Sequence, residues 1–169
     1  MKSAEKESMM NRKQALIPGT FDPVTLGHLA VIRTAANIFE KITVCILVNP
    51  DKQCMFDEET RVRALKIAVA EFSNVGVAIS HGMTADFAKE IGAGTIVRGI
   101  RNAEDAAYEL EMAEFNRKRT GVETLLLPAP EELRRISSTA VRAMLKEGKS
   151  PSELLPDGIW DLLREQGGS

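Results

Sequence analysis

The chain has few of the residues from which many catalytic and structural sites are built. Its 169 residues include two cysteines, two histidines, one tryptophan and one tyrosine. Two cysteines without a spacing pattern do not form a disulfide framework, and with two distant histidines they do not make a structural zinc site. The net charge of −2 also gives no general basic face for nucleic acid. Any site for an anion must therefore be a local cluster.

Long apolar runs are absent as well. No stretch approaches the roughly 20 apolar residues of a membrane-spanning helix, and the polar start of the chain lacks the apolar segment of a signal peptide. We therefore expect a cytoplasmic protein with no membrane partner. Residues 1–12 are expected to form a flexible leader, and residues 13–169 a single domain. Cys45, within ITVCILV, is expected to be a small core residue.

Apolar residues follow two alternating periods along the chain. Short apolar runs predict strands at 14–18, 41–48, 75–80, 95–100 and 123–128. Helical spacing of apolar residues predicts helices at 28–39, 57–72, 84–92, 102–121, 137–148 and 156–168. The alternation predicts an α/β fold: a single-domain, Rossmann-like, parallel five-stranded sheet with helices on both faces. In such sheets, ligands bind outside the carboxyl ends of the strands.

Several predicted helices carry capping residues. Asp57, Thr84 and Ser137 stand at helix starts, where short polar side chains accept hydrogen bonds from free backbone N–H groups. Gly92 and Gly121 stand at helix ends, where glycine readily adopts the left-handed conformation. These residues are expected to fix the helix boundaries.

The loop after the first predicted strand, in IPGTFDPVTLGH, holds one of the two histidines. Gly19 allows a turn without a Cβ, and Thr20 brings a hydroxyl to the strand end. His28 stands where the next helix opens, and free N–H groups at a helix start attract phosphate. A histidine at this point can donate to the same anion. The alternative is a histidine that faces water.

Cationic side chains follow two further strands. Lys52 lies in NPDKQ after the second strand, while Arg98 and Arg101 flank the end of the fourth strand in RGIR. Guanidinium groups suit pairs of phosphate oxygens. The alternatives are a solvated lysine and two surface arginines paired with Glu104 or Asp105.

A run of hydroxyl groups follows the fifth strand, in ISSTAVR. Capping by Ser137 explains one hydroxyl of the three. Four of the five strands thus end in hydrogen-bond donors or cations at one edge, which predicts a site for an extended polyphosphate. The sequence has no P-loop, no glycine pattern of dinucleotide binding and no G-x-S-x-G elbow.

Four segments together resemble the phosphopantetheine adenylyltransferase family of the nucleotidylyltransferase superfamily. They are PGTFDPVTLGH, NPDKQ, VRGIRNAEDAAYELEMAEFNR and ISSTAVR, and the resemblance runs from about residue 14 to residue 165. It implies a reaction in which ATP and 4′-phosphopantetheine give dephospho-coenzyme A and pyrophosphate, with Mg²⁺ and no protein metal ligand. It also implies a homohexamer and coenzyme A as a feedback ligand.

The resemblance further implies roles for particular residues. His28 is expected to be catalytic and to contact ATP, and Thr20 to contact both substrates. Lys52, Thr84 and Arg98 are expected to bind 4′-phosphopantetheine. The remaining expected ATP-binding residues are Phe21, Gly99, Ile100, Arg101, Glu109, Leu133, Arg134, Arg135, Ile136, Ser137, Ser138 and Thr139. Members often carry an aromatic residue shortly before ISS, whereas this chain reads EELRRISST.

Other functions stay open at this point. The nearest is a nucleotidylyltransferase with another phosphorylated acceptor, such as nicotinamide mononucleotide or glycerol phosphate; these enzymes usually have a histidine where this chain has Thr25. A second is a nucleotide sensor without catalysis. A third is an interaction module whose basic edge binds acidic partners, against which the dispersed placement of the cations speaks.

Overall fold

The computed structural model describes residues 11–166, so the first ten residues of the expected leader lie outside this range. Within it, one parallel sheet contains β1 (Asn11–Gly19), β2 (Lys41–Leu47), β3 (Val75–Ser80), β4 (Ala93–Ile100) and β5 (Glu123–Pro128). The strand order is β3-β2-β1-β4-β5, which confirms the predicted five-stranded fold. β1 begins before residue 14, because Asn11 pairs with Ala93 beyond a register shift. The polar NRK segment gives no apolar signal of this extension.

The helices of the described residues follow the strands in turn. They are α1 (Leu26–Ile38), α2 (Glu58–Val69), α3 (Thr84–Glu90), α4 (Ala103–Thr120), α5 (Ser138–Lys146) and α6 (Ile159–Gln166). Two short 3₁₀ turns, η1 (Glu131–Leu133) and η2 (Ser152–Leu154), flank α5. None of the helices within residues 11–166 is long and apolar enough to cross a membrane.

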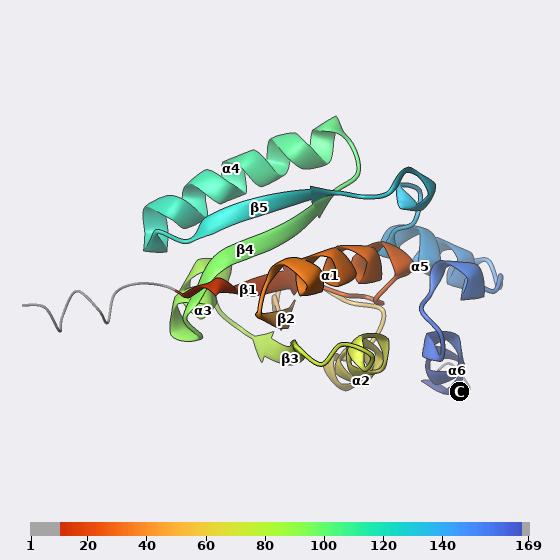
Figure 1. The fold of residues 1–169 in the computed structure, drawn as a ribbon. Coiled ribbons are helices and arrows are strands. Elements are labelled where there is room, and N and C mark those ends of the chain that lie inside the picture. Colours follow the sequence, from red (N-terminus) through yellow and green to blue (C-terminus); the bar gives the residue numbers. More distant parts are fainter. Residues whose placement is uncertain (1–10, 167–169) are drawn as a thin grey trace, which may run out of the picture.

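Helices cover both faces of the sheet, as predicted (Figure 1). Alternate residues of β1 point to opposite sides: Ala15 and Ile17 pack in a cluster with α1, α2, α5 and α6. Leu16 packs on the other side with Cys45 and the alanines of α3, and α4 contacts α3 and β5. Cys45 is fully buried, and burial raises the pKa of its thiol to about 12. Its expected core position is confirmed.

Most of the expected helix caps are present. Asp57 accepts a hydrogen bond from the Thr60 N–H at 2.8 Å, and Ser137 accepts one from the Ala140 N–H at 3.1 Å. Gly121 ends α4 with φ of 78°. The cap expected of Thr84 is wrong: the N-cap of α3 is Met83, without a side-chain hydrogen bond, and Thr84 is the first helical residue.

Candidate active site

A cleft of about 340 Å³ opens at the carboxyl ends of β1 and β4, next to the start of α5. It lies at the switch point of the strand order. From β1, the chain adds β2 and β3 on one side of the sheet and then β4 and β5 on the other. Most of the residues expected to bind ligands line it: Thr20, Phe21, His28, Lys52, Arg98, Gly99, Arg101, Glu109, Leu133, Ile136, Ser137, Ser138 and Thr139. The fold thus brings together side chains from more than 100 residues of sequence.

Four expected site residues do not line this cleft. Thr84 lies at the start of α3, and Ile100 ends β4. Arg134 and Arg135 are exposed beyond η1, and the Nε atom of Arg134 donates to the Ala129 carbonyl at 3.4 Å. In this part of the chain, the cleft is lined instead by Leu133, the last residue of η1, and by Ile136, just before α5.

His28 is half-buried in the third position of α1, where it helps to cap the helix. Its Nδ1 atom accepts the Thr25 N–H at 3.0 Å, while Thr25 Oγ1 accepts the His28 N–H at 3.4 Å. Because Nδ1 is an acceptor, the neutral ring carries its proton on Nε2. Burial, and then the charges of Arg98 and Arg101, lower the pKa of His28 to about 4. The cleft therefore holds a neutral imidazole with one N–H donor.

Phe21 packs against this histidine. Its ring centroid lies 4.8 Å from that of His28, and its side chain is buried. The backbone of Phe21 has φ of 49°, in the left-handed region that non-glycine residues rarely adopt. Such strain is retained where the surrounding structure requires one backbone path, often at functional sites.

Two cations meet at Thr20. Lys52 Nζ donates to Thr20 Oγ1 at 3.2 Å, and Arg61 Nη1 of α2 donates to the Thr20 carbonyl at 2.9 Å. Arg61 is buried, and its Nε atom is without a hydrogen-bond partner within the described part of the chain. The sequence gives no signal of this role, because Arg61 lies in an amphipathic helix where arginine is common.

Arg98 is fixed by two other groups. Its Nε and Nη2 atoms lie 3.0 and 2.9 Å from Glu109 Oε1, and its Nη1 atom donates to the Pro18 carbonyl at 2.5 Å. Arg101 pairs with Asp105 at 3.1 Å, one of the surface pairings considered above, but it lines the cleft as well. Pairing and placement at the site are therefore compatible.

The start of α5 forms one wall of the cleft. The capping bond uses the Ser137 oxygen as an acceptor, whereas Ser138 Oγ donates to the Pro23 carbonyl at 2.8 Å. Thr139 Oγ1 accepts from Arg142 Nη2 at 3.2 Å. The hydroxyls are thus partly used for structure, while the free N–H groups of the helix start remain a favourable environment for an anion.

A second hollow adjoins the first and shares part of its wall. Gly19, Thr20, Lys52 and Arg98 line both. The second hollow extends over β2 and α2 and is also lined by Val48, Cys54, Phe56, Arg61 and Tyr108. Two molecules placed in the two hollows would therefore meet at the same cations.

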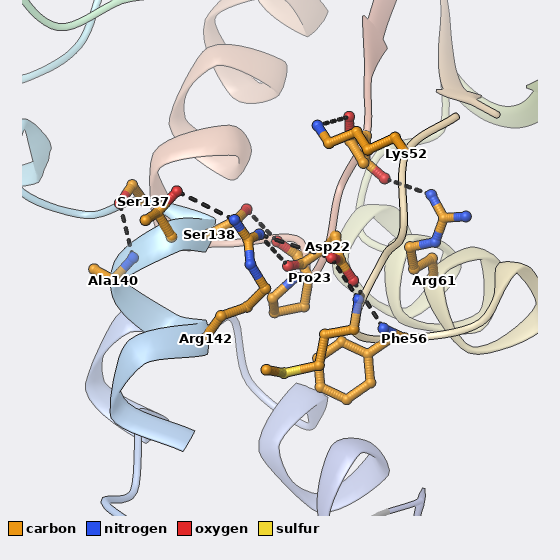
Figure 2. A network of polar contacts seen from close by, with 12 residues as sticks. Asp22, Pro23, Lys52, Phe56, Arg61, Ser137, Ser138, Ala140 and Arg142 are labelled. Carbon is orange, nitrogen blue, oxygen red and sulfur yellow. Dashed lines mark hydrogen bonds and ion pairs between the residues drawn. The ribbon is translucent and has the colours of Figure 1, made fainter. Parts of the chain in front are cut away.

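Sequence reasoning assigned no site role to four polar residues at or near the site: Asp22, Thr25, Arg61 and Arg142. Figure 2 shows three of them, with Asp22 between Phe56 and Arg142 and with Arg61 on α2. Their partners lie far away in sequence, so no local pattern marks them. The capping role of Thr25 was detectable from the sequence. A threonine at the N-cap, followed three residues later by a side chain that can bond to the N-cap N–H, is a capping-box arrangement.

Comparison with known proteins places the chain in a family. The model of the cytidylyltransferase-like family matches residues 16–144. A phosphopantetheine adenylyltransferase of Cutibacterium acnes is 39% identical over 153 residues, which cover 90% of this chain and 98% of that protein. A solved structure from Vibrio parahaemolyticus, described as a nicotinate-nucleotide adenylyltransferase, has the same fold, with a TM-score of 0.70 at 23% identity over 91% and 93% of the two chains. The chain therefore belongs to the cytidylyltransferase-like family and, within it, to the phosphopantetheine adenylyltransferases.

Proposed function

We propose that this protein transfers the adenylyl group of ATP to 4′-phosphopantetheine, forming dephospho-coenzyme A and releasing pyrophosphate. The observation that carries the proposal is the shared wall of the two hollows, where Lys52, Arg98 and Thr20 lie together. ATP occupies the cleft between His28 and the start of α5, and the acceptor occupies the second hollow. The reacting phosphates then meet at the cations.

The nucleophile is a phosphate oxygen of the acceptor. A phosphate monoester has its second pKa near 6, so it is largely a dianion at neutral pH and needs no general base. The barrier comes from bringing two anions together in line, and positioned positive charge lowers it. Lys52 and Arg98 hold the attacking phosphate, and Thr20 contacts both substrates.

His28 stabilises the charge that builds on the α-phosphate. A neutral imidazole with its proton on Nε2 donates a hydrogen bond to a phosphate oxygen. Because the ring carries no charge, no anion of the protein has to leave it before the nucleotide binds. Because the Thr25 N–H fixes the ring through Nδ1, the donor direction is set before the nucleotide arrives. We therefore assign His28 the catalytic role.

The rest of the nucleotide contacts the remaining lining residues. Arg101, Ser137, Ser138 and the start of α5 hold the β- and γ-phosphates. The ATP site is completed by six other lining residues: Phe21, Gly99, Glu109, Leu133, Ile136 and Thr139. Roles for Thr84, Ile100, Arg134 and Arg135 stay predictions, because these residues lie outside the cleft lining.

Magnesium accompanies ATP in this proposal. The three carboxylates in the cleft wall are already engaged: Asp105 with Arg101, Glu109 with Arg98, and Asp22 with the N–H groups of Met55 and Phe56. Within residues 11–166, the side chains of histidine, cysteine, aspartate and glutamate form no cluster of three that could hold a metal. Mg²⁺ often keeps several waters and binds substrate phosphates, so the cleft fits an ion that arrives on the nucleotide. Bound there, it supplies positive charge to the phosphate oxygens.

We also propose a homohexamer, feedback binding of coenzyme A and a cytoplasmic location. Exposed apolar side chains on α4 support an assembly: Tyr108, Leu110 and Phe115 are 59%, 63% and 44% exposed. Coenzyme A combines a nucleotide with a phosphopantetheine arm, so it suits both hollows at once. Both cysteines are free, as is usual in a reducing compartment. Light scattering tests the assembly, and competition against each substrate tests coenzyme A.

The proposed reaction is tested by pyrophosphate release with ATP and a panel of acceptors. We expect release with 4′-phosphopantetheine and only background with nicotinamide mononucleotide or glycerol 3-phosphate. Release with one of the other acceptors alone identifies a different nucleotidylyltransferase. ATP binding without release for any acceptor favours the nucleotide sensor.

A further inference from the structure

Asp22 is a buried carboxylate that the proposed reaction does not use. The residue is 4% exposed and lies between β1 and α1. Oδ1 accepts the Phe56 N–H and Oδ2 accepts the Met55 N–H, each at 2.9 Å. Both amides belong to the segment of residues 48–57 between β2 and α2, which we call the Lys52 loop. One carboxylate thus holds the loop that carries the acceptor-side lysine.

The same residue is held from the nucleotide side of the cleft. Arg142 of α5 donates from Nη1 to the Asp22 carbonyl at 2.8 Å, and the same atom lies 3.8 Å from Asp22 Oδ2. The next carbonyl, that of Pro23, accepts from Ser138 Oγ at 2.8 Å. Figure 2 shows Asp22 at the centre of this network, with the Lys52 loop on one side and α5 on the other.

We propose that Asp22 is a positioning residue that holds Lys52 at the wall shared by the two hollows, next to the half of the cleft that takes the nucleotide. Lys52 itself is exposed and donates to Thr20. Lys52 lies only three residues before Met55, so the amide bonds to Asp22 limit how far the lysine moves from the shared wall. Naming the held ligand as the acceptor phosphate rests on the proposed function.

The chemistry requires a carboxylate at this position. Two N–H groups point at two oxygen atoms, and an ionised carboxylate is the side chain that offers acceptors only. In Asp22→Asn, one oxygen becomes an NH₂ donor facing a backbone donor, while size and shape stay nearly the same. One of the two bonds to the Lys52 loop is then lost, and an unsatisfied amide replaces it.

The test compares steady-state kinetics of the wild type, Asp22→Asn and the control Asp51→Asn. Asp51 is an exposed carboxylate of the same loop. We expect Asp22→Asn to raise KM for 4′-phosphopantetheine by about tenfold, the effect of one lost charge-assisted hydrogen bond, with KM for ATP within about threefold. Asp51→Asn should change both KM values by less than about twofold, as an exposed charge does. In a Lys52→Ala background, Asp22→Asn should add little to the acceptor KM, because its effect acts through Lys52.

Several outcomes would overturn the inference. A lowered Tm with unchanged KM for the acceptor would make Asp22 a structural residue only. Equal increases of both KM values, or full additivity with Lys52→Ala, would separate Asp22 from Lys52. If the variant does not fold, amide hydrogen exchange of the wild type decides instead. Met55 and Phe56 should then be protected relative to Gln53 of the same loop, and equal exchange rates would refute the proposal.

The experiment separates this inference from the proposed function. A wild type that releases no pyrophosphate with 4′-phosphopantetheine refutes the function, while amide exchange at Met55 and Phe56 still tests the hold of Asp22 on the loop. An active wild type with an Asp22→Asn variant of unchanged kinetics refutes the inference alone.

Discussion

The Nδ1 atom of His28 accepts the backbone N–H of Thr25 at 3.0 Å, so the side chain that lines the cleft also completes the capping box of α1. The candidate catalytic side chain is therefore also part of the cap that begins α1. The bond fixes the ring orientation and leaves Nε2 as the donor. Substitutions of His28 affect both properties unless the cap is preserved.

A glutamine at position 28 should separate these two properties. His28→Gln keeps an acceptor that reaches back to the N-cap N–H, as in the common capping box, but removes the imidazole. We expect kcat to fall by about 10²–10³, the loss for one positioned donor, with little change in stability. His28→Ala should lose the same activity and in addition about 1 kcal/mol of stability. Turnover and urea unfolding of both variants check this, and near-normal turnover in either would remove His28 from the mechanism.

Stability should depend on pH through His28. Its pKa of about 4 in the folded protein lies below its ordinary value of 6.5, so between these values the unfolded chain binds a proton that the folded chain does not. Stability is therefore lost as the pH falls from 6.5 toward 4, by roughly 2–4 kcal/mol in total. Protonated Nδ1 would also face the Thr25 N–H, donor against donor.

Urea unfolding at several pH values measures this dependence. The difference in stability between the wild type and His28→Gln should change with pH between 6.5 and 4 and be constant above 7. A difference between wild type and His28→Gln that does not vary with pH would contradict the lowered pKa.

Removing Lys52 should weaken the acceptor more than the nucleotide. The lysine lines the wall that both hollows share but belongs to the loop on the acceptor side. We expect Lys52→Ala to raise the Kd of 4′-phosphopantetheine by about tenfold or more, the loss of a charge-assisted contact, and that of ATP by much less. Calorimetry measures both, with the exposed Lys66→Ala of α2 as control. Equal losses for the two ligands would reject this placement.

The ion pair of Arg98 and Glu109 should contribute to stability. Glu109 is 6% exposed and accepts from two nitrogens of Arg98, so Glu109→Gln leaves a partly buried guanidinium without its counter-charge. We expect a loss of about 1–3 kcal/mol, because Arg98 is partly reached by water. Chemical denaturation checks this beside Glu111→Gln, an exposed neighbour on α4. Equal stability of the two variants would show that the pair adds nothing.

The sequence predicts the sheet well because its signals are local. Strand and helix periods alternate along the chain, and Asp57 and Ser137 mark helix starts within three residues of their partners. Thr84 misleads for the same reason: its residue type favours a cap, but it is the first residue of α3, with Met83 as the N-cap and Ala85 and Ala88 buried against the sheet.

The site is predictable only where it lies at strand ends. Thr20 directly follows β1, and Arg98 lies near the end of β4. Lys52 and Ser137 lie in the segments that follow β2 and β5, so parallel topology brings all four residues to one edge. Arg61 and Arg142 are different, because their acceptors in the β1–α1 loop are 41 and 120 residues away. Such contacts depend on how helices pack, which the local sequence pattern does not encode.

The hydrogen bond between Lys52 and Thr20 has an entropic consequence for binding. A lysine side chain in an exposed loop ordinarily samples many rotamers, and fixing it costs up to about 2 kcal/mol of conformational entropy. Here the ammonium group already rests on Thr20 Oγ1 at 3.2 Å, with further N–H donors left to turn toward an anion. Part of that entropy is lost on folding, so an arriving phosphate meets a cation whose freedom has already been reduced.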